Sequence, residues 1–175
     1  MQWTPSLRDV PFFRHLDDEE REELEELLEP AAFEAGENIF EEGGSEERLY
    51  VITSGTVEVH KRVIPGRRQH LATMVAPTVV GEMGLLTEPR ATASVEARTR
   101  VEAYGIDRDR FLEMLDADSP AACKVVYEIG RTLAGRMAKT DESIAALIAQ
   151  LESARADDIT DFDVFQDRLI REWSF

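Results

Sequence analysis

The sequence predicts an α+β fold in which an antiparallel β-roll, of the jelly-roll or double-stranded β-helix type, is flanked by helices. Two observations support this prediction. Between Ala31 and Asp107, short runs that alternate apolar and polar residues, such as Val57-Glu58-Val59, are separated by glycines and Pro77, a pattern typical of antiparallel strands with tight turns. On both sides of this region, apolar residues recur at spacings of three and four, the period of an amphipathic helix.

Asp17 is placed to cap the first expected helix, because Glu20 follows three residues later in the spacing of a capping box. The apolar stripe of this helix consists of Leu24, Leu27 and Leu28. We expect the many acidic residues around the stripe to form a solvated face.

Basic residues gather at one expected hairpin tip, around Pro65-Gly66. They are Lys61, Arg62, Arg67, Arg68 and His70. We interpret them as solvated hairpin charge, with contact to a partner as the alternative.

The segment from Gly81 to Val95 has the features of an anion-binding segment. Gly81 permits a sharp turn, after which residues 82–86 can form one helical turn whose unpaired amide groups attract phosphate. Arg90 supplies a fixed positive charge that can bind two phosphate oxygens. Glu82 would repel an anion unless it accepts hydrogen bonds from a neutral group, and a sugar hydroxyl is the obvious candidate.

Two helices are expected after the strands. Asp107 or Asp109 caps a short one that runs through Leu115, and Ser119-Pro120 begins a long one. Apolar residues along the long helix alternate spacings of three and four, which is typical of a seam between two paired helices. The seam consists of Val126, Ile129, Leu133, Met137, Thr140, Ile144, Leu147 and Leu151. We expect it to form a homodimer, and the alternative is a helix that packs only on its own sheet.

Three blocks of the sequence, in order, resemble the cyclic-nucleotide-binding domain family of the catabolite activator protein, the regulatory subunits of protein kinase A and the cyclic-nucleotide-gated channels. They are Phe33 to Gly43, Leu49 to Val59 and Gly81 to Val95. The resemblance covers roughly residues 7 to 150. It implies a β-roll with N-terminal helices over residues 1–118, a long dimerisation helix over 119–153, and an acidic linker with an amphipathic segment over 154–175.

The resemblance also implies a ligand, cyclic AMP or cyclic GMP, held between the roll and the long helix. Glu82 would accept a hydrogen bond from a ribose hydroxyl. The phosphate would be held by Arg90 and by the amide groups of Gly81, Ala91 and Thr92. Thr140 would meet the base, since Ala134 to Thr140 resembles the stretch that presents a threonine across the dimer in this family. The implied ligand-binding residues are Gly81, Glu82, Met83, Arg90, Ala91, Thr92 and Thr140.

The chain departs from the family pattern at the phosphate arginine. Aligned without gaps, that arginine falls on Ala91, and Arg90 lies one residue early. Either the loop from Thr87 to Pro89 is one residue shorter and Arg90 occupies the usual place, or Arg90 points elsewhere and the pocket lacks its main charge. A shift of one residue reverses the face of a side chain in a strand, whereas a loop can compensate.

Composition narrows the function classes. With 36 acidic and 20 basic residues the formal charge is −16, which disfavours nucleic acid and anionic membranes as partners. No apolar run approaches the ~20 residues of a membrane span, and the start lacks a signal-peptide pattern, so we expect a cytoplasmic protein. Cys123 is interpreted as a small buried side chain. His15, His60 and His70 lack metal-ligand spacing, and neither catalysis nor a metal is expected.

Two hypotheses follow. The first is a regulatory protein without a winged helix, which binds a cyclic nucleotide and signals to a partner through its C-terminal helices. The second is an interaction or scaffold module whose pocket has degenerated.

The segment of residues 162–175 places aromatic and apolar residues at helical spacing, namely Phe162, Phe165, Leu169 and Trp173. It either folds back on its own domain or docks on a partner protein.

Overall fold

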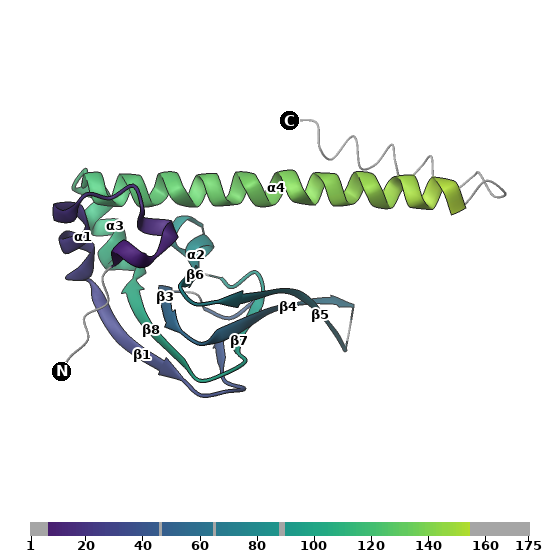
Figure 1. The fold of residues 1–175 in the computed structure, drawn as a ribbon, viewed down its shortest axis with the longest axis horizontal. Coiled ribbons are helices and arrows are strands. Elements are labelled where there is room, and N and C mark those ends of the chain that lie inside the picture. Colours follow the sequence, from purple (N-terminus) through teal and green to yellow (C-terminus); the bar gives the residue numbers. More distant parts are fainter. Residues whose placement is uncertain (1–6, 46, 65, 88–89, 155–175) are drawn as a thin grey trace. The chain divides into compact units, whose positions relative to one another are not determined.

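The computed structural model describes residues 7–45, 47–64, 66–87 and 90–154 (Figure 1). The chain forms two compact units, Met1–Arg131 and Thr132–Phe175. The first unit contains all of the described strands. The expected segment boundaries at residues 118 and 153 stay predictions.

The N-terminal part consists of two 3-10 helices, Leu7–Asp9 and Pro11–Phe13, and helix α1, Asp18–Glu25. The predicted capping box is present, because the Glu20 amide donates to the Asp17 carboxylate (3.0 Å) and the Asp17 amide donates to the Glu20 carboxylate (2.8 Å). The predicted apolar stripe is wrong at its end. Helix α1 stops at Glu25, and Leu28 already begins the first strand.

In the described part of the chain, eight strands form two antiparallel sheets, which confirms the predicted fold class. One sheet has the order β1-β8-β3-β6 and the other β2-β7-β4-β5. The strands are β1 Leu28–Phe33, β2 Asn38–Phe40, β3 Arg48–Ser54, β4 Thr56–Ile64, β5 Arg67–Val75, β6 Thr78–Val80, β7 Ser94–Ala97 and β8 Val101–Asp107. Non-consecutive neighbours within each sheet roll the chain around one core.

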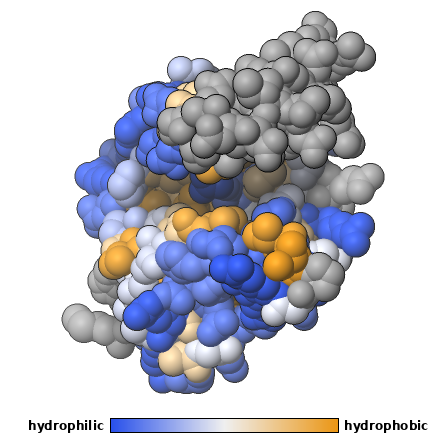
Figure 2. Space-filling model, turned by 90° about the vertical axis from the view of Figure 1, so that its right-hand side faces the viewer, coloured by the Kyte–Doolittle hydropathy of each residue, from blue (hydrophilic) through white to orange (hydrophobic). Residues whose placement is uncertain are grey.

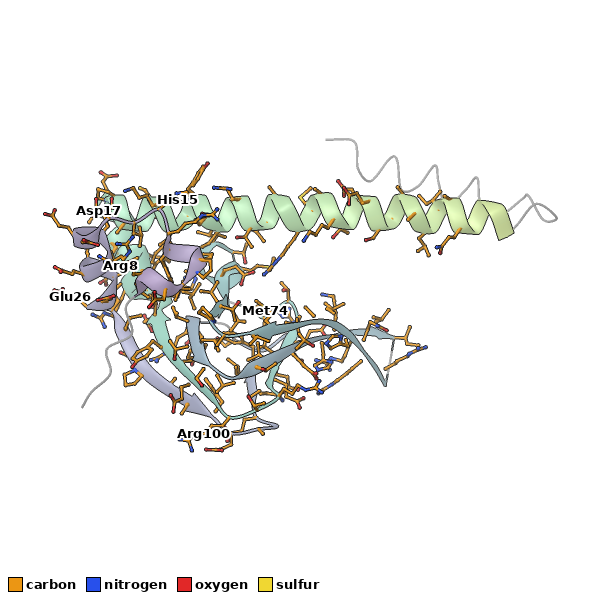
Figure 3. The ribbon with its side chains drawn as sticks, in the orientation of Figure 1. Arg8, His15, Asp17, Glu26, Met74 and Arg100 are labelled. Carbon is orange, nitrogen blue, oxygen red and sulfur yellow. The ribbon has the colours of Figure 1, made fainter. Side chains whose placement is uncertain are left out.

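That core contains fully buried aliphatic side chains from both sheets, including Ile52, Val57 and Val101. Met74, labelled in Figure 3, packs against it. Ala91 belongs to the same cluster although it lies outside the strands. The core therefore reaches under the segment that precedes β7.

Strands β4 and β5 form a hairpin that extends beyond the neighbouring strands (Figure 1). Figure 2 looks onto the end at which this hairpin projects and shows apolar patches within a largely hydrophilic surface. Exposed aliphatic residues of the hairpin are Val63, Ile64, Leu71 and Val75. Arg67 and Arg68 are exposed beside them, as expected of solvated hairpin charge.

Three helices complete the described fold: α2 Glu82–Leu86, α3 Arg108–Asp116 and α4 Pro120–Ala154. Of the two proposed caps of α3, Asp107 is the one used, since its carboxylate accepts from the amides of Asp109 and Arg110. Helix α4 begins at Pro120 as predicted. Among the described helices, none has both the length and the apolar content required to cross a membrane.

The first turns of α4 pack within the first unit. Glu128 is buried, and its carboxylate lies 2.9 Å from the ring of His15 and 3.2 Å from the guanidinium of Arg14 (Figure 3). Ile129 is fully buried. Cys123 is exposed, so its interpretation as a buried side chain is wrong.

The predicted helix seam therefore divides into two parts. Ile129 serves the core of its own unit, which is the alternative that the sequence left open. Farther along, Met137 is 64% exposed and Leu147 is 57% exposed. Dimerisation through this part of the seam stays a prediction.

Candidate functional site

Gly81 sets the start of the candidate site. It caps α2 with a left-handed backbone (φ 88°), and an added Cβ would overlap the Arg48 carbonyl and lie 2.9 Å from the Phe40 ring. Only glycine suits both conditions. Directly after it, Glu82 is only 4% exposed, so its carboxylate lies inside the fold rather than in solvent.

Four hydrogen bonds, donated by Thr87 and Arg108, hold the other end of α2. The amide and the hydroxyl of Thr87 donate to the Met83 carbonyl at 3.1 and 3.0 Å. Arg108, at the start of α3, donates from Nε to the Gly84 carbonyl (2.9 Å) and from a terminal nitrogen to the Thr87 carbonyl (3.2 Å). Arg108 therefore fixes the helix end from a segment that the sequence did not connect with the site.

Arg90 and Ala91 lie in opposite environments. Ala91 is 3% exposed and packs in the core, whereas Arg90 is exposed and its Nε donates to the Gly43 carbonyl at 3.3 Å. Arg90 also forms an isolated bridge with Ser45. The structure thus has Arg90 exposed beside Gly43 and Ala91 in the core. Whether Arg90 occupies the usual place of the phosphate arginine stays a prediction.

Two backbone hydrogen bonds join Ala91 to the loop that follows β2. The Gly43 amide donates to the Ala91 carbonyl (2.8 Å), and the Ala91 amide donates to the Gly44 carbonyl (2.9 Å). The expectation that the Ala91 amide holds a phosphate is therefore wrong, because this donor already has a backbone partner.

A cleft of about 530 Å³ opens beside these residues. Its lining comes from the loop after β2, from strand β4 and from the segment after α2, namely Glu42, Gly43, Lys61, Thr87, Arg90, Ala91 and Thr92. Lys61 Nζ donates to the Thr92 carbonyl at 2.7 Å. Lys61 is exposed, as expected of hairpin charge, and it also lines the cleft.

The charges around the cleft are unequal. Glu42 is the acidic residue of the described lining, and its carboxylate accepts from the Arg62 amide at 2.7 Å and lies 3.7 Å from Arg62 Nε. An arginine thus offsets this carboxylate, while Lys61 and Arg90 contribute two positive charges to the same lining. Such a cleft attracts an anion.

Other predicted site residues lie apart from this lining. In the described part of the chain, Gly81, Glu82 and Met83 are not among the residues that border the cleft. Met83 is adjacent to it, because the Thr92 hydroxyl donates to its sulfur at 3.6 Å. Thr140 belongs to the second unit, and its hydroxyl donates to the Arg136 carbonyl at 3.0 Å.

Lys61, Glu42, Gly43 and Thr87 line the cleft but were absent from the predicted site. Strand alternation could have indicated Lys61. Val57 and Val59 pack in or against the core, and a residue two positions farther along the strand points to the same face. No group of described His, Cys, Asp and Glu side chains is arranged to hold a metal.

Comparison with known proteins shows the family and the fold of the chain. The sequence model of the cyclic nucleotide-binding domain matches residues 30–118, just over half of the chain. A CRP-like cAMP-activated global transcriptional regulator of Mycobacterium tuberculosis is 33% identical over 126 residues, which make up 71% of this chain and 54% of that protein. The chain therefore spans about half the length of this curated relative.

Two solved structures share the fold. The catabolite activator protein of Thermus thermophilus has a TM-score of 0.70 and 26% identity, over 78% of this chain and 62% of that one. A mutant regulatory subunit of a cAMP-independent protein kinase A from Trypanosoma brucei, with cAMP bound in its A site, has a TM-score of 0.65 and 31% identity, over 73% of this chain and 44% of that one. The chain belongs to the cyclic nucleotide-binding domain family.

Proposed function

We propose that this protein is a regulator that binds cyclic AMP, or cyclic GMP, at the cleft beside Arg90. The observation that carries the proposal is that Arg90, an exposed cation, lines the cleft beside Ala91, which lines it too and packs in the core. The charge that a cyclic phosphate needs is thus present despite the shifted position of the arginine in the sequence.

In this proposal, the terminal nitrogens of Arg90 bind two oxygens of the cyclic phosphate. Guanidinium and phosphate match in geometry and in charge, so such a contact is stronger than a neutral hydrogen bond. The Gly43 carbonyl orients the arginine by accepting from Nε, and Arg90 lies in the lining of the cleft. The amides of Gly81 and Thr92 are proposed as further donors.

The remaining contacts are proposed from the resemblance. Glu82 would accept from the ribose hydroxyl, Met83 would lie beside the sugar and phosphate, and Thr140 would meet the base. The proposed ligand is cyclic AMP or cyclic GMP.

We propose that the signal leaves through the C-terminal helices of a cytoplasmic homodimer. Exposed Met137 and Leu147 favour helix pairing through residues 119–153. The segment of residues 162–175, proposed to contact a partner protein, lies outside the described residues. Ligand binding would then shift an equilibrium between two arrangements of these helices.

The alternative was a scaffold with a degenerate pocket. It requires a cleft without its main charge, and the positive side chains of Arg90 and Lys61 in the lining support nucleotide binding over this alternative. We therefore favour the nucleotide-binding function.

Isothermal titration calorimetry with cyclic AMP and with cyclic GMP tests the proposal. The parent protein should bind one of them with a micromolar or lower Kd, and Arg90→Ala should weaken binding by about 10- to 100-fold, the worth of a charge-assisted contact. Arg67→Ala is the matched control, because Arg67 is an exposed arginine of β5 that does not line the cleft. It should bind like the parent.

Two outcomes would contradict the proposal. One is an absence of heat from parent protein that is folded and free of co-purified nucleotide. The other is an Arg90→Ala variant that binds as tightly as the parent. The first outcome would favour the scaffold function.

A further inference from the structure

We infer that Lys61 is a second phosphate-binding cation of the cleft, which makes the site fit a terminal phosphate with two negative charges as well as a singly charged cyclic phosphate. The inference rests on the proposed nucleotide-binding function of the cleft. It identifies a ligand class, the nucleoside monophosphates with a free phosphate group, that competes for the same position.

The first support is the position of Lys61. It lies on β4, whereas Arg90 lies in the segment between α2 and β7, and both line the same cleft. Lys61 donates to the Thr92 carbonyl at 2.7 Å, and Arg90 donates to the Gly43 carbonyl at 3.3 Å. Each cation is thus directed by a backbone oxygen on the border of the cleft.

The second support is the number of hydrogen-bond donors. An ammonium group has three N–H donors. Within the described part of the chain, Lys61 uses one of them for the Thr92 carbonyl. The other two are available to a ligand next to Thr92, and a phosphate oxygen is the acceptor that such a charge prefers.

The third support is the balance of charge. Lys61, Arg90 and Arg62 are opposed near the cleft by the carboxylate of Glu42, which contacts Arg62. This local excess of positive charge occurs in a chain of formal charge −16, so it does not follow from the overall composition. A cyclic phosphate has one negative charge, and a terminal phosphate approaches two at neutral pH because its second pKa is about 6.

A purely structural role for Lys61 predicts a different result. If the ammonium group only held the Thr92 carbonyl, its loss would loosen the segment around Thr92 and weaken every ligand by the same factor. If Lys61 instead contacts the phosphate, loss of its charge weakens the binding of a dianion more than the binding of a monoanion. The ratio of the two affinities therefore separates the two roles.

The experiment is calorimetry at pH 7.5 with cyclic AMP and with 5′-AMP, on the parent protein and on Lys61→Met, Lys61→Arg and Arg67→Met. Lys61 is exposed and its charge is screened. We therefore expect Lys61→Met to weaken the binding of 5′-AMP by about tenfold and the binding of cyclic AMP by about threefold. Lys61→Arg should keep both affinities within about twofold, because the charge is retained. Arg67→Met, which removes an exposed cation away from the cleft, should match the parent.

The results separate this inference from the proposed function. If the parent binds cyclic AMP but Lys61→Met weakens both ligands equally, or neither, the inference is overturned and the function stands. The same holds if the parent binds cyclic AMP and not 5′-AMP at millimolar concentration. If the folded parent binds neither ligand and does not bind cyclic GMP either, the proposed function and the inference both fail.

Discussion

The segment from Gly81 to Ser94 and the second half of α4 differ in what holds their residues. In the first, the surroundings of Gly81 leave no room for a side chain, and both the amide and the carbonyl of Ala91 form hydrogen bonds with the loop after β2. In the second, the hydroxyls of Thr140 and Ser143 donate to carbonyls of their own helix, and Leu147 is exposed. Contacts within one chain can thus fix the geometry of a site, whereas the role of an exposed helix seam depends on the partner that packs against it.

The largest effect that would test this comparison is expected from Gly81→Ala. The added methyl group would overlap the Arg48 carbonyl and would also force a residue with a side chain to keep a positive φ. We expect a loss of about 3 to 4 kcal/mol in the free energy of unfolding. Denaturation in urea, followed by circular dichroism, measures it.

Gly36→Ala is the matched control, because Gly36 has nearly the same φ, 89°, but no atom within 4 Å of the added Cβ. This variant should lose only about 1 kcal/mol, the cost of the backbone strain alone. Equal losses in the two variants would show that the contacts around Gly81 do not constrain it.

The same difference explains which features the sequence could predict. The strands followed from alternation, and the capping box of α1 followed from Asp17 and Glu20, because each of these patterns depends on local geometry. The register of Arg90 did not follow, since the ladder of β7 begins only at Ser94 and the preceding loop obeys no alternation. The contacts of Ala91 with Gly43 and Gly44, far away in the sequence, fix that register.

In helix α4, the spacing of apolar residues does not show which of them are buried. Ile129, Met137 and Leu147 occupy equivalent places in one apolar seam, yet Ile129 is fully buried in the first unit and the other two are exposed. A spacing of three and four identifies the apolar face of a helix but not its partner. For the same reason, Leu28 fitted the stripe of α1 although it begins β1.

The second prediction tests the register by exchange. The double variant Arg90→Ala with Ala91→Arg restores the ungapped family pattern, but it places a guanidinium group where Ala91 packs in the core. We expect a loss of about 2 kcal/mol of unfolding free energy and no recovery of nucleotide binding, because a buried charge is costly without a partner. Denaturation and calorimetry on the same samples measure both effects.

Arg90→Ala alone is the control for this exchange. Arg90 is exposed, so its removal should change the unfolding free energy by no more than about 0.5 kcal/mol. If the double variant bound the nucleotide like the parent, the assignment of Arg90 to the phosphate would be wrong.

The third prediction concerns the seam of α4. Leu147→Glu places a charge on the predicted dimer face, and in a symmetric dimer it does so twice. We expect the dissociation constant of the dimer to rise at least about 30-fold, which corresponds to about 2 kcal/mol. Sedimentation velocity at micromolar concentration measures the change.

Ala146→Glu is the control, since Ala146 is exposed on the same turn but lies outside the seam. It should leave the dimer intact. A parent protein that sediments as a monomer, or a Leu147→Glu variant that stays dimeric, would exclude pairing through this face.

The smallest effect is expected from Thr140→Ala. Its hydroxyl now donates to the Arg136 carbonyl at 3.0 Å, and contact with a base would replace one neutral hydrogen bond by another. We therefore expect cyclic AMP binding to weaken by no more than about fivefold, near 1 kcal/mol. Ser143→Ala removes a similar hydroxyl, which donates to the Lys139 carbonyl at 2.8 Å, and should leave the affinity unchanged. If both variants bind like the parent, the Thr140 hydroxyl has no part in reading the base. A loss confined to Thr140→Ala would instead mean that the second half of this helix, whose hydroxyls otherwise bond only within the helix, takes part in binding the ligand.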